Sequence, residues 1–163
     1  MQNTKQIIYE NGDILNWAGK VDVIGHQVNC FGVMGGGLAL QIARKWLEVL
    51  TEYQSFIEKF ISRSARANLL GYCEIVRVKE CSVANLFGQY DLGARDVATN
   101  YPALRVALKR LKNKMAVLGF KKLALPVNLG CGLAGGDWSI VRGIIEDVFE
   151  NSDIQVTLVE YKA

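Results

Sequence analysis

A chain of 163 residues can form one compact domain, and we expect a single domain that spans residues 1–163. Half of the residues are hydrophobic, which excludes a disordered chain, and a net charge of +3 is too small to indicate nucleic-acid binding by itself. The N-terminus lacks the apolar run of a signal peptide, and no stretch is apolar for long enough to span a membrane. A cytoplasmic protein is therefore expected.

The cysteines and the histidine do not form a metal-binding pattern. A single histidine and four scattered cysteines, without a Cys-x-x-Cys pair, exclude the usual structural zinc sites. We therefore expect reduced thiols, no metal site and no bound cofactor. The cysteines are Cys30, Cys73, Cys81 and Cys131.

The first half of the chain alternates strand-like and helical stretches. The apolar run VDVIGHQV at 21–28 is typical of a strand that is buried on both faces. A helix is expected over 36–61 with a break near Leu47, and the polar segment 61–71 is expected to be a connection. The motif NGD at 11–13 is expected to end the first strand. The other strands of this half are expected at 5–10, 72–80 and 81–87.

The second half continues the alternation after a loop at 88–100. Pro102 suits the first turn of a helix, and Gly119 is expected to end that helix in a left-handed conformation. Another helix is expected over Asp137–Phe149. The first of these helices carries an apolar stripe of Leu104, Ala107, Leu108, Leu111, Met115 and Leu118. Strands are expected at 121–127 and 154–161. This alternation predicts an α/β/α fold, with helices on both faces of a sheet.

Two glycine-rich loops each stand between a strand and a helix. The first contains Gly35, Gly36 and Gly37, and the second, GCGLAGG, runs from Gly130 to Gly136. In an α/β sheet this position lies at the carboxyl edge, where unpaired N–H groups at a helix N-terminus favour an anion. Either loop could be a tight turn without a ligand, but two loops of the same kind favour a ligand that carries phosphate.

Two common nucleotide motifs do not fit these loops. Gly130, Gly132 and Gly135 spell Gly-x-Gly-x-x-Gly, but the dinucleotide-binding fold places this motif after its first strand and continues with further units. Here the sequence stops at Ala163. No Gly-Lys-Ser/Thr follows either loop, which excludes a Walker A loop.

The order of the motifs resembles the macro domain, an ADP-ribose-binding α/β/α module. The resemblance covers nearly the whole chain and rests on NGDIL after the first strand, VNCFGVMGGGLA after the second and ALPVNLGCGLAGGDW near the end. Within the family, the chain is most similar to the branch of ADP-ribose 1″-phosphate phosphatases and terminal ADP-ribose glycohydrolases. The resemblance implies a three-layer α/β/α sandwich with a mostly parallel mixed sheet.

The family pattern also implies roles for individual residues. Asp13 would accept a hydrogen bond from the adenine amino group beside the Ile14 backbone, and Asn29 would hydrogen-bond the distal ribose. The first glycine loop would let that ribose and the diphosphate lie against bare backbone. The second would hold the diphosphate with main-chain N–H groups. The implied ligand-binding residues are Asp13, Ile14, Asn29, Gly35, Gly36, Gly37, Gly130, Cys131, Gly132, Leu133, Ala134 and Gly135.

Each polar candidate also has a structural interpretation. Asp13 could cap the short helix that follows it, and Asn29 could bond the backbone of its own loop. Asp137 is most simply the N-cap of the last helix, with a catalytic role as the alternative. Cys30 and Cys131 are interpreted as packing residues.

A run of basic residues accompanies the helix that begins near Pro102. We interpret it as a solvated helix face, with an RNA-binding surface as the alternative. The run comprises Arg105, Lys109, Arg110, Lys112, Lys114, Lys121 and Lys122. Nucleic acid is not expected to be the main partner.

The sequence departs from both catalytic patterns of the family. One branch carries an aspartate two residues beyond the glycine run, where this chain has Leu38 and Ala39. The glycohydrolase branch uses a lysine after VANLF and an aspartate after GCGL, where this chain has Gln89 and Ala134. His26, the single histidine, occupies a place where phosphatase-like relatives carry one. It could assist the leaving oxygen as an imidazolium, or it could be a buried core histidine.

We therefore expect a protein that binds ADP-ribose or an ADP-ribose conjugate, with an ADP-ribosylated macromolecule as a further partner. The leading activity is metal-independent hydrolysis of ADP-ribose 1″-phosphate or of an ADP-ribosyl conjugate, with His26 and Asp137 as candidate catalytic residues. A non-catalytic ADP-ribose reader and an RNA-contacting module are the open alternatives.

Overall fold

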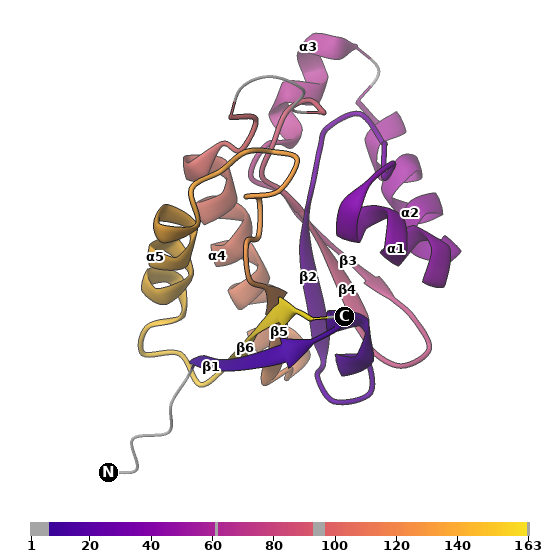
Figure 1. Ribbon diagram of the computed structural model, residues 1–163. Coiled ribbons are helices and arrows are strands. Elements are labelled where there is room, and N and C mark those ends of the chain that lie inside the picture. Colours follow the sequence, from indigo (N-terminus) through magenta and orange to yellow (C-terminus); the bar gives the residue numbers. More distant parts are fainter. Residues whose placement is uncertain (1–6, 61, 93–96, 163) are drawn as a thin grey trace.

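Six strands form the central layer of the protein. The computed structural model describes residues 7–60, 62–92 and 97–162, and its sheet has the strand order β1-β6-β5-β2-β4-β3 (Figure 1). Neighbouring strands are parallel, except that β3 pairs antiparallel with β4. The mostly parallel mixed sheet expected from the sequence is therefore confirmed. The strands are β1 (Ile7–Gly12), β2 (Val23–Val28), β3 (Cys73–Arg77), β4 (Ser82–Phe87), β5 (Lys122–Pro126) and β6 (Gln155–Tyr161).

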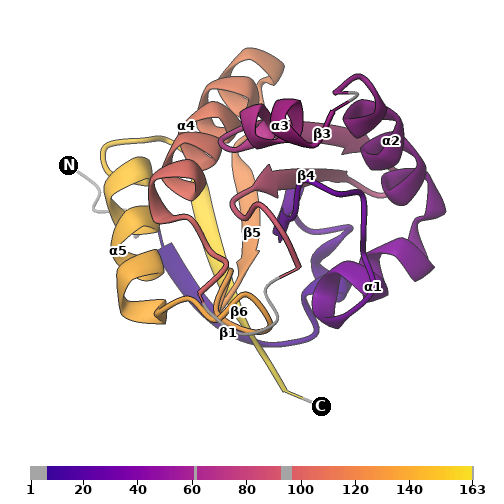
Figure 2. The ribbon, with the colours of Figure 1, turned by 90° about the horizontal axis from the view of Figure 1, so that it is seen from above.

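Helices cover both faces of this sheet and complete the expected three layers. α4 (Tyr101–Leu118) and α5 (Trp138–Phe149) lie on one face, and α1 (Gly37–Lys45) and α2 (Leu47–Glu58) lie on the other (Figures 1 and 2). None of the helices among the described residues combines the length and the apolar character that a membrane span requires. The short helices are η1 (Ile14–Trp17), α3 (Arg63–Arg66) and η2 (Ala67–Leu69).

Each pair of layers encloses its own hydrophobic core. The apolar stripe of α4 faces the sheet except for Leu118, which is exposed at the end of the helix. Leu108 and Leu111 share a buried cluster with Leu123 of β5 and Ile145 of α5. A second cluster lies between the sheet and α1 and α2, with Ile24 of β2 among its fully buried members. β2 contributes to both cores, as its continuous apolar run predicted.

The first strand is longer than the sequence suggested. The motif NGD was expected to end it, but Asn11 and Gly12 pair with Glu160 and Tyr161 of β6. Gly12 has a φ of +143°, and a Cβ on it would lie 3.2 Å from the ring of Trp17. Glycine therefore lets the strand continue past the indole ring. The first two residues of the expected strand lie outside the described residues.

The long helical stretch is divided in two, as predicted near Leu47. Trp46 separates α1 from α2 with φ −130° and ψ 87°, and its buried indole N–H donates to Glu80 Oε2 at 3.0 Å. α2 ends at Glu58, which is earlier than expected, and Ile61 lies outside the described residues. The indole contact anchors the junction, so the chain leaves the helical conformation there.

The segment expected to be a plain connection at 61–71 contains α3 and η2. Ser62 caps α3, because its hydroxyl oxygen accepts the Ala65 N–H at 3.1 Å. The polar composition of this segment therefore encodes a helix cap as well as a loop.

Both ends of α4 lie where the turn residues predicted them. Asn100 accepts the Ala103 N–H at 3.0 Å as N-cap, Pro102 lies in the first turn, and Gly119 ends the helix with a φ of +74°. These local signals fix the register of the apolar stripe.

The packing of α4 leads to a stability prediction. Leu111→Ala should lower the free energy of unfolding by about 2–5 kcal/mol, because the side chain is fully buried and its removal leaves a cavity. Val117→Ala on the same helix should change it by less than about 0.5 kcal/mol, since Val117 is 88% exposed. Urea denaturation measures both values. Similar losses for the two variants would contradict the placement of α4.

Candidate functional site

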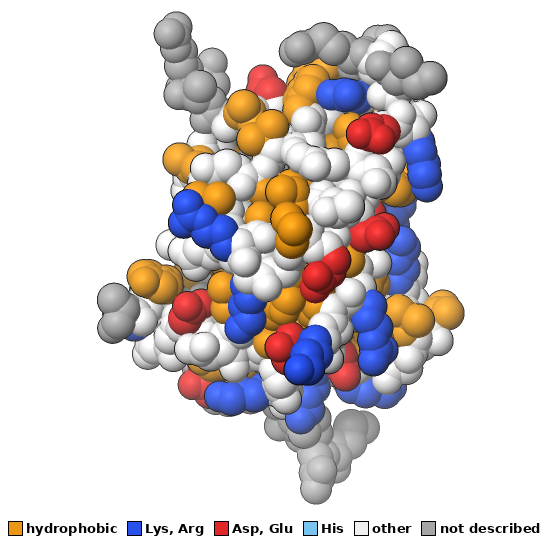
Figure 3. Space-filling view, turned by 90° about the vertical axis from the view of Figure 1, so that its right-hand side faces the viewer, with side chains coloured by type: hydrophobic (Ala, Val, Ile, Leu, Met, Phe, Trp, Pro, Cys, Tyr) orange, Lys and Arg blue, Asp and Glu red, His pale blue; other side chains and the backbone are white. Residues whose placement is uncertain are grey.

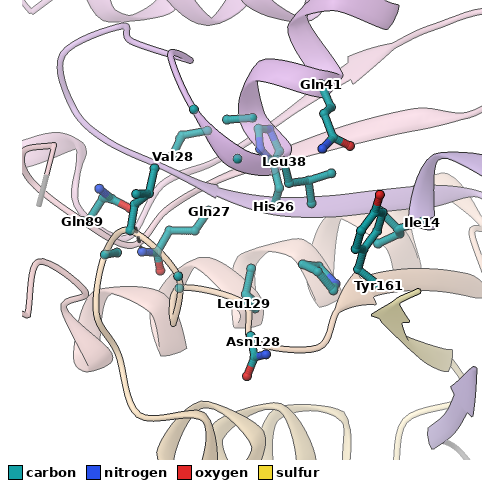
Figure 4. Close-up of a pocket in the computed structure, with 18 of the residues that line it drawn as sticks. Ile14, His26, Gln27, Val28, Leu38, Gln41, Gln89, Asn128, Leu129 and Tyr161 are labelled. Carbon is teal, nitrogen blue, oxygen red and sulfur yellow. Dashed lines mark hydrogen bonds between the residues drawn. The ribbon is translucent and has the colours of Figure 1, made fainter. Parts of the chain in front are cut away.

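The segments that follow β2 and β5 enclose a pocket at the carboxyl ends of the parallel strands (Figure 4). Its volume is about 560 Å³, within the range of small-molecule sites. Both glycine loops contribute to its wall, as do the ends of β1 and β6. No Asp, Glu, Lys or Arg is among the described residues of this wall. Its polar side chains are Gln27, Asn29, Gln41, Gln89, Asn128, His26 and Tyr161.

A buried tyrosine holds the first glycine loop. Tyr53 of α2 donates to the Asn29 carbonyl oxygen at 2.6 Å, and the Gly32 N–H donates to the tyrosine oxygen at 3.2 Å. Asn29 Oδ1 accepts the Phe31 N–H at 2.9 Å, and its Nδ2 donates to the Val33 carbonyl at 2.8 Å. The Asn29 side chain therefore bonds its own loop, as the structural interpretation predicted, while it also lines the pocket.

The three consecutive glycines lead from this loop into α1. Gly35, Gly36 and Gly37 all line the pocket, and Gly37 has a left-handed φ of +54°. A Cβ on Gly36 would lie 2.9 Å from Leu133 Cδ1 of the second loop. The Leu133 side chain therefore approaches the bare backbone of Gly36 closely, and the two loops meet there. No side chain caps α1 at this end, so its first N–H groups are available to an anion.

The second glycine loop is tightly folded on itself. Asn128 and Gly130 have φ values of +69° and +70°. The Gly130 carbonyl accepts the Gly136 N–H at 2.9 Å and the Thr99 hydroxyl at 2.6 Å. A Cβ on Gly136 would lie 2.6 Å from that carbonyl oxygen, so this position has no room for a side chain.

Only some residues of the second glycine loop line the pocket. The residues that line the pocket are Gly130, Gly132, Leu133 and Ala134. Cys131 and Gly135, which the sequence also assigned to ligand binding, are not among the lining residues. Burial raises the pKa of Cys131 to about 11 and that of Cys30 to about 12, so both are protonated thiols at neutral pH. This agrees with their interpretation as packing residues.

η1 forms one end of the pocket. Ile14 and Tyr161 lie at this end, and Gln27 and Gln89 lie at the other (Figure 4). Asp13 is not among the lining residues, and its Oδ1 accepts the main-chain N–H two positions further on at 3.0 Å. The helix cap offered as the alternative for Asp13 is therefore present, and its contact with adenine stays a prediction.

A carboxamide that the sequence analysis missed joins β2 to both ends of the loop at 88–100 at the other end of the pocket. Gln27 Nε2 donates to Gln89 Oε1 and to Thr99 Oγ1, each at 2.9 Å. A Cβ would lie 2.4 Å from Gln27 Oε1 if placed on Gly88 and 2.8 Å if placed on Gly130. The sequence did contain a signal for Gln27, because it is a polar residue inside the apolar run of β2 and lies next to the first glycine loop.

His26 is a buried neutral histidine. It is 2% exposed, its Nε2 lies 2.6 Å from Asn85 Oδ1, and its Nδ1 has no partner among the described residues. Burial lowers the pKa of His26 to about 4, despite the opposing hydrogen bond from Asn85. A buried, neutral imidazole fits the core-histidine interpretation, and a catalytic role for His26 stays a prediction. The residue nevertheless lines the pocket.

Asp137 is a helix cap, as its structural interpretation predicted. Its Oδ1 accepts the hydroxyl and the N–H of Ser139 at 2.7 and 2.9 Å, and these bonds hold the pKa of the carboxyl below its ordinary value. Asp137 is not among the residues that line the pocket. The helix cap is therefore present, and the catalytic role considered for Asp137 stays a prediction.

Several residues of the basic run tie α4 to neighbouring segments. Arg110 Nη1 donates to the Gly71 carbonyl at 2.9 Å, Lys114 Nζ donates to the Cys73 carbonyl at 2.6 Å, and Lys112 donates to a carbonyl of α5. These cations are therefore not simply solvated, which corrects the interpretation from the sequence. On the side that carries α1 and α2, basic and acidic side chains are interspersed (Figure 3).

Within the described ranges, no three His, Cys, Asp or Glu side chains gather in one place where they could hold a metal ion.

The buried imidazole makes stability depend on pH. Because the pKa of His26 is about 4 in the folded state and 6.5 in the unfolded state, the unfolded state takes up a proton first as the pH falls. Between pH 7 and 4.5, the protein should lose about 2–3 kcal/mol more unfolding free energy than His26→Gln, which cannot titrate there. Urea denaturation at both pH values checks this. Equal losses would show that His26 is accessible to protons in the folded state.

Comparison with known proteins identifies relatives of this chain. The ADP-ribose 1″-phosphate phosphatase of Saccharomyces cerevisiae is 32% identical over 113 residues, which are 65% of this chain and 60% of the yeast protein. The human ADP-ribose glycohydrolase OARD1 is 25% identical over 158 residues, 94% of this chain and 90% of the human protein. An uncharacterized 17.5 kDa protein of Enterobacteria phage T4 is 25% identical over 162 residues, 94% and 96% of the two chains. No protein-family model matches.

Solved structures with the same fold cover almost all of the chain. A protein of unknown function from Bacteroides thetaiotaomicron has a TM-score of 0.81 and 28% identity, over 97% of this chain and 99% of the other. The macrodomain of Mycobacterium tuberculosis DarG has a TM-score of 0.77 and 25% identity, over 96% and 97%. Thermosipho africanus DarTG, solved in complex with ADP-ribose, has a TM-score of 0.77 and 19% identity, over 98% of this chain and 43% of the other.

Proposed function

We propose that this chain, which has the macrodomain fold, binds ADP-ribose between its two glycine loops and hydrolyses an ADP-ribose conjugate. The observation that carries the proposal is the pocket at the carboxyl edge of the sheet, which two glycine loops and the uncapped N-terminus of α1 enclose. The names of the yeast and human relatives, and the DarTG structure with ADP-ribose, support the same ligand.

The shape of the pocket suggests how the ligand would lie. Adenine would lie near Ile14 and Tyr161, with Asp13 beside its amino group. The diphosphate would lie along the two glycine loops, where main-chain N–H groups and the α1 dipole favour an anion. The distal ribose would then reach the end of the pocket at Gln27, beside the Asn29 loop.

The chemistry of the wall limits how hydrolysis would proceed. Since no charged side chain lines the pocket within the described residues, loop N–H groups would stabilise the phosphate or leaving oxygen. The neutral imidazole of His26 would act as a proton acceptor. The substrates that fit are ADP-ribose 1″-phosphate and ADP-ribose attached to a macromolecule.

A reader that binds ADP-ribose without hydrolysis is the second candidate. The observation in its favour is that Gln89 and Ala134 replace the lysine and the aspartate of the glycohydrolase branch, while Asp137 serves as a helix cap. Turnover separates the two candidates.

Binding is tested by calorimetry with ADP-ribose. We expect saturable binding, and Gly36→Val should abolish it, because the new side chain would fill the space between the loops while Leu133 can move aside. Gly19→Val is the matched control, since a Cβ there meets nothing within 4 Å and the residue lies outside the pocket wall. Normal binding by Gly36→Val would place the site elsewhere.

Hydrolysis is tested with ADP-ribose 1″-phosphate and with ADP-ribosylated protein and nucleic acid. We expect product release from at least one substrate, and His26→Gln should lower turnover at saturating substrate by about 10²-fold or more. Binding without turnover of any substrate would establish the reader instead.

A further inference from the structure

Three polar side chains cross the sheet in one row beneath α1 and α2. His26 of β2 lies directly opposite Asn85 of β4, which lies directly opposite Glu74 of β3. His26 Nε2 is 2.6 Å from Asn85 Oδ1, and Asn85 Nδ2 donates to Glu74 Oε1 at 3.0 Å. His26 and Asn85 are 2% and 0% exposed. We call His26, Asn85 and Glu74 the polar row.

The surroundings of the polar row make each of its hydrogen bonds costly to lose. Ile24 and Val28 flank His26 along β2, Val83 and Phe87 flank Asn85 along β4, and all four belong to the buried apolar cluster. A polar atom left unpaired in such surroundings loses its hydrogen bonds to water without replacement. The orientation of each group in the polar row is therefore determined by its neighbour.

The order of donors and acceptors assigns the tautomer of the imidazole. A carboxylate can only accept, so ionised Glu74 takes the N–H₂ side of the Asn85 amide at Oε1. The carbonyl side of that amide then faces His26 and can only accept. His26 Nε2 must therefore carry the hydrogen, and Nδ1 keeps a lone pair.

The polar row leaves this lone pair without a donor at the pocket. His26 Nδ1 is buried and has no partner among the described residues, while His26 itself forms part of the pocket wall. Buried acceptors of this kind are rare unless a ligand or water completes them. Phosphate oxygens offer no hydrogen to Nδ1 at neutral pH, whereas the hydroxyls of a ribose do.

We propose that Asn85 and Glu74 are positioning residues that fix His26 in the Nε2–H tautomer, so that Nδ1 accepts a hydrogen bond from a hydroxyl of the distal ribose. The proposal rests on the proposed binding of ADP-ribose. It gives the pocket a means of placing sugar rather than phosphate against β2. Glu74 acts through two hydrogen bonds and does not touch the ligand.

The tautomer can be measured directly, because His26 is the single histidine of the chain. Long-range ¹H–¹⁵N spectra of the ¹⁵N-labelled protein at pH 7, made without a histidine tag, should show Nε2 protonated and Nδ1 unprotonated. The opposite tautomer in the free protein would overturn the inference, whatever the protein binds.

Two variants of Glu74 separate positioning from general support of the fold. Glu74→Gln keeps an acceptor oxygen for Asn85, so the tautomer and the ADP-ribose affinity should be retained. Glu74→Ala removes that acceptor and lets the Asn85 amide turn, so the Nδ1–H tautomer should appear and the affinity should fall by about tenfold. An unchanged tautomer in folded Glu74→Ala would show that Glu74 has no positioning role.

Ligand titration tests the hydroxyl contact. ADP-ribose should move the Nδ1 resonance toward the value of a hydrogen-bonded nitrogen, whereas AMP, which lacks the distal ribose, should not. If calorimetry shows that ADP-ribose binds and Nδ1 does not respond, this inference fails and the proposed function stands. If ADP-ribose does not bind at all, the proposed function fails, and the tautomer spectrum still decides the role of Asn85 and Glu74.

Discussion

The pocket depends on the hydrogen bonds that Gln27 makes at the end of the pocket opposite Ile14 and Tyr161. Its carboxamide joins Gln89, which follows β4, to Thr99, and Thr99 in turn holds the Gly130 carbonyl of the second glycine loop. Three segments that are far apart in the sequence thereby meet at one side chain. Gly88 and Gly130 leave room for that side chain. The lack of a side chain at each glycine is therefore needed for the hydrogen bonds of Gln27 as well as for the turn in which the glycine lies.

Much of the fold was predictable because local signals agreed with the global pattern. The limits of α4 followed from Pro102 and Gly119, and the burial of β2 followed from its apolar run. The longer β1 was not predictable, because pairing with β6 overrides the turn propensity of Asn11 and Gly12. Such pairing is a long-range contact that a local motif does not contain.

In the candidate site, too, the features that depend on local sequence were predictable and those that depend on long-range contacts were not. The sequence located both glycine loops and the cap made by Asp137, because turns and caps are local. It gave no orientation for His26, whose protonation depends on burial and on Asn85 of the neighbouring strand, and it missed Gln27 for a similar reason. Side chains whose chemistry depends on residues 59 to 72 positions away cannot be assigned from their neighbours in sequence.

The described residues of the pocket wall carry no charged side chain, which has a consequence for the rate at which a ligand binds. Main-chain N–H groups and a helix terminus act as dipoles, whose influence is confined to the first turn of the helix, whereas clustered charges attract a ligand over a distance of about a Debye length. Such a wall recognises an anion on contact but does not steer it from solution. The association rate of an anionic ligand should therefore vary little with ionic strength, and the residence time should determine how tightly it is held.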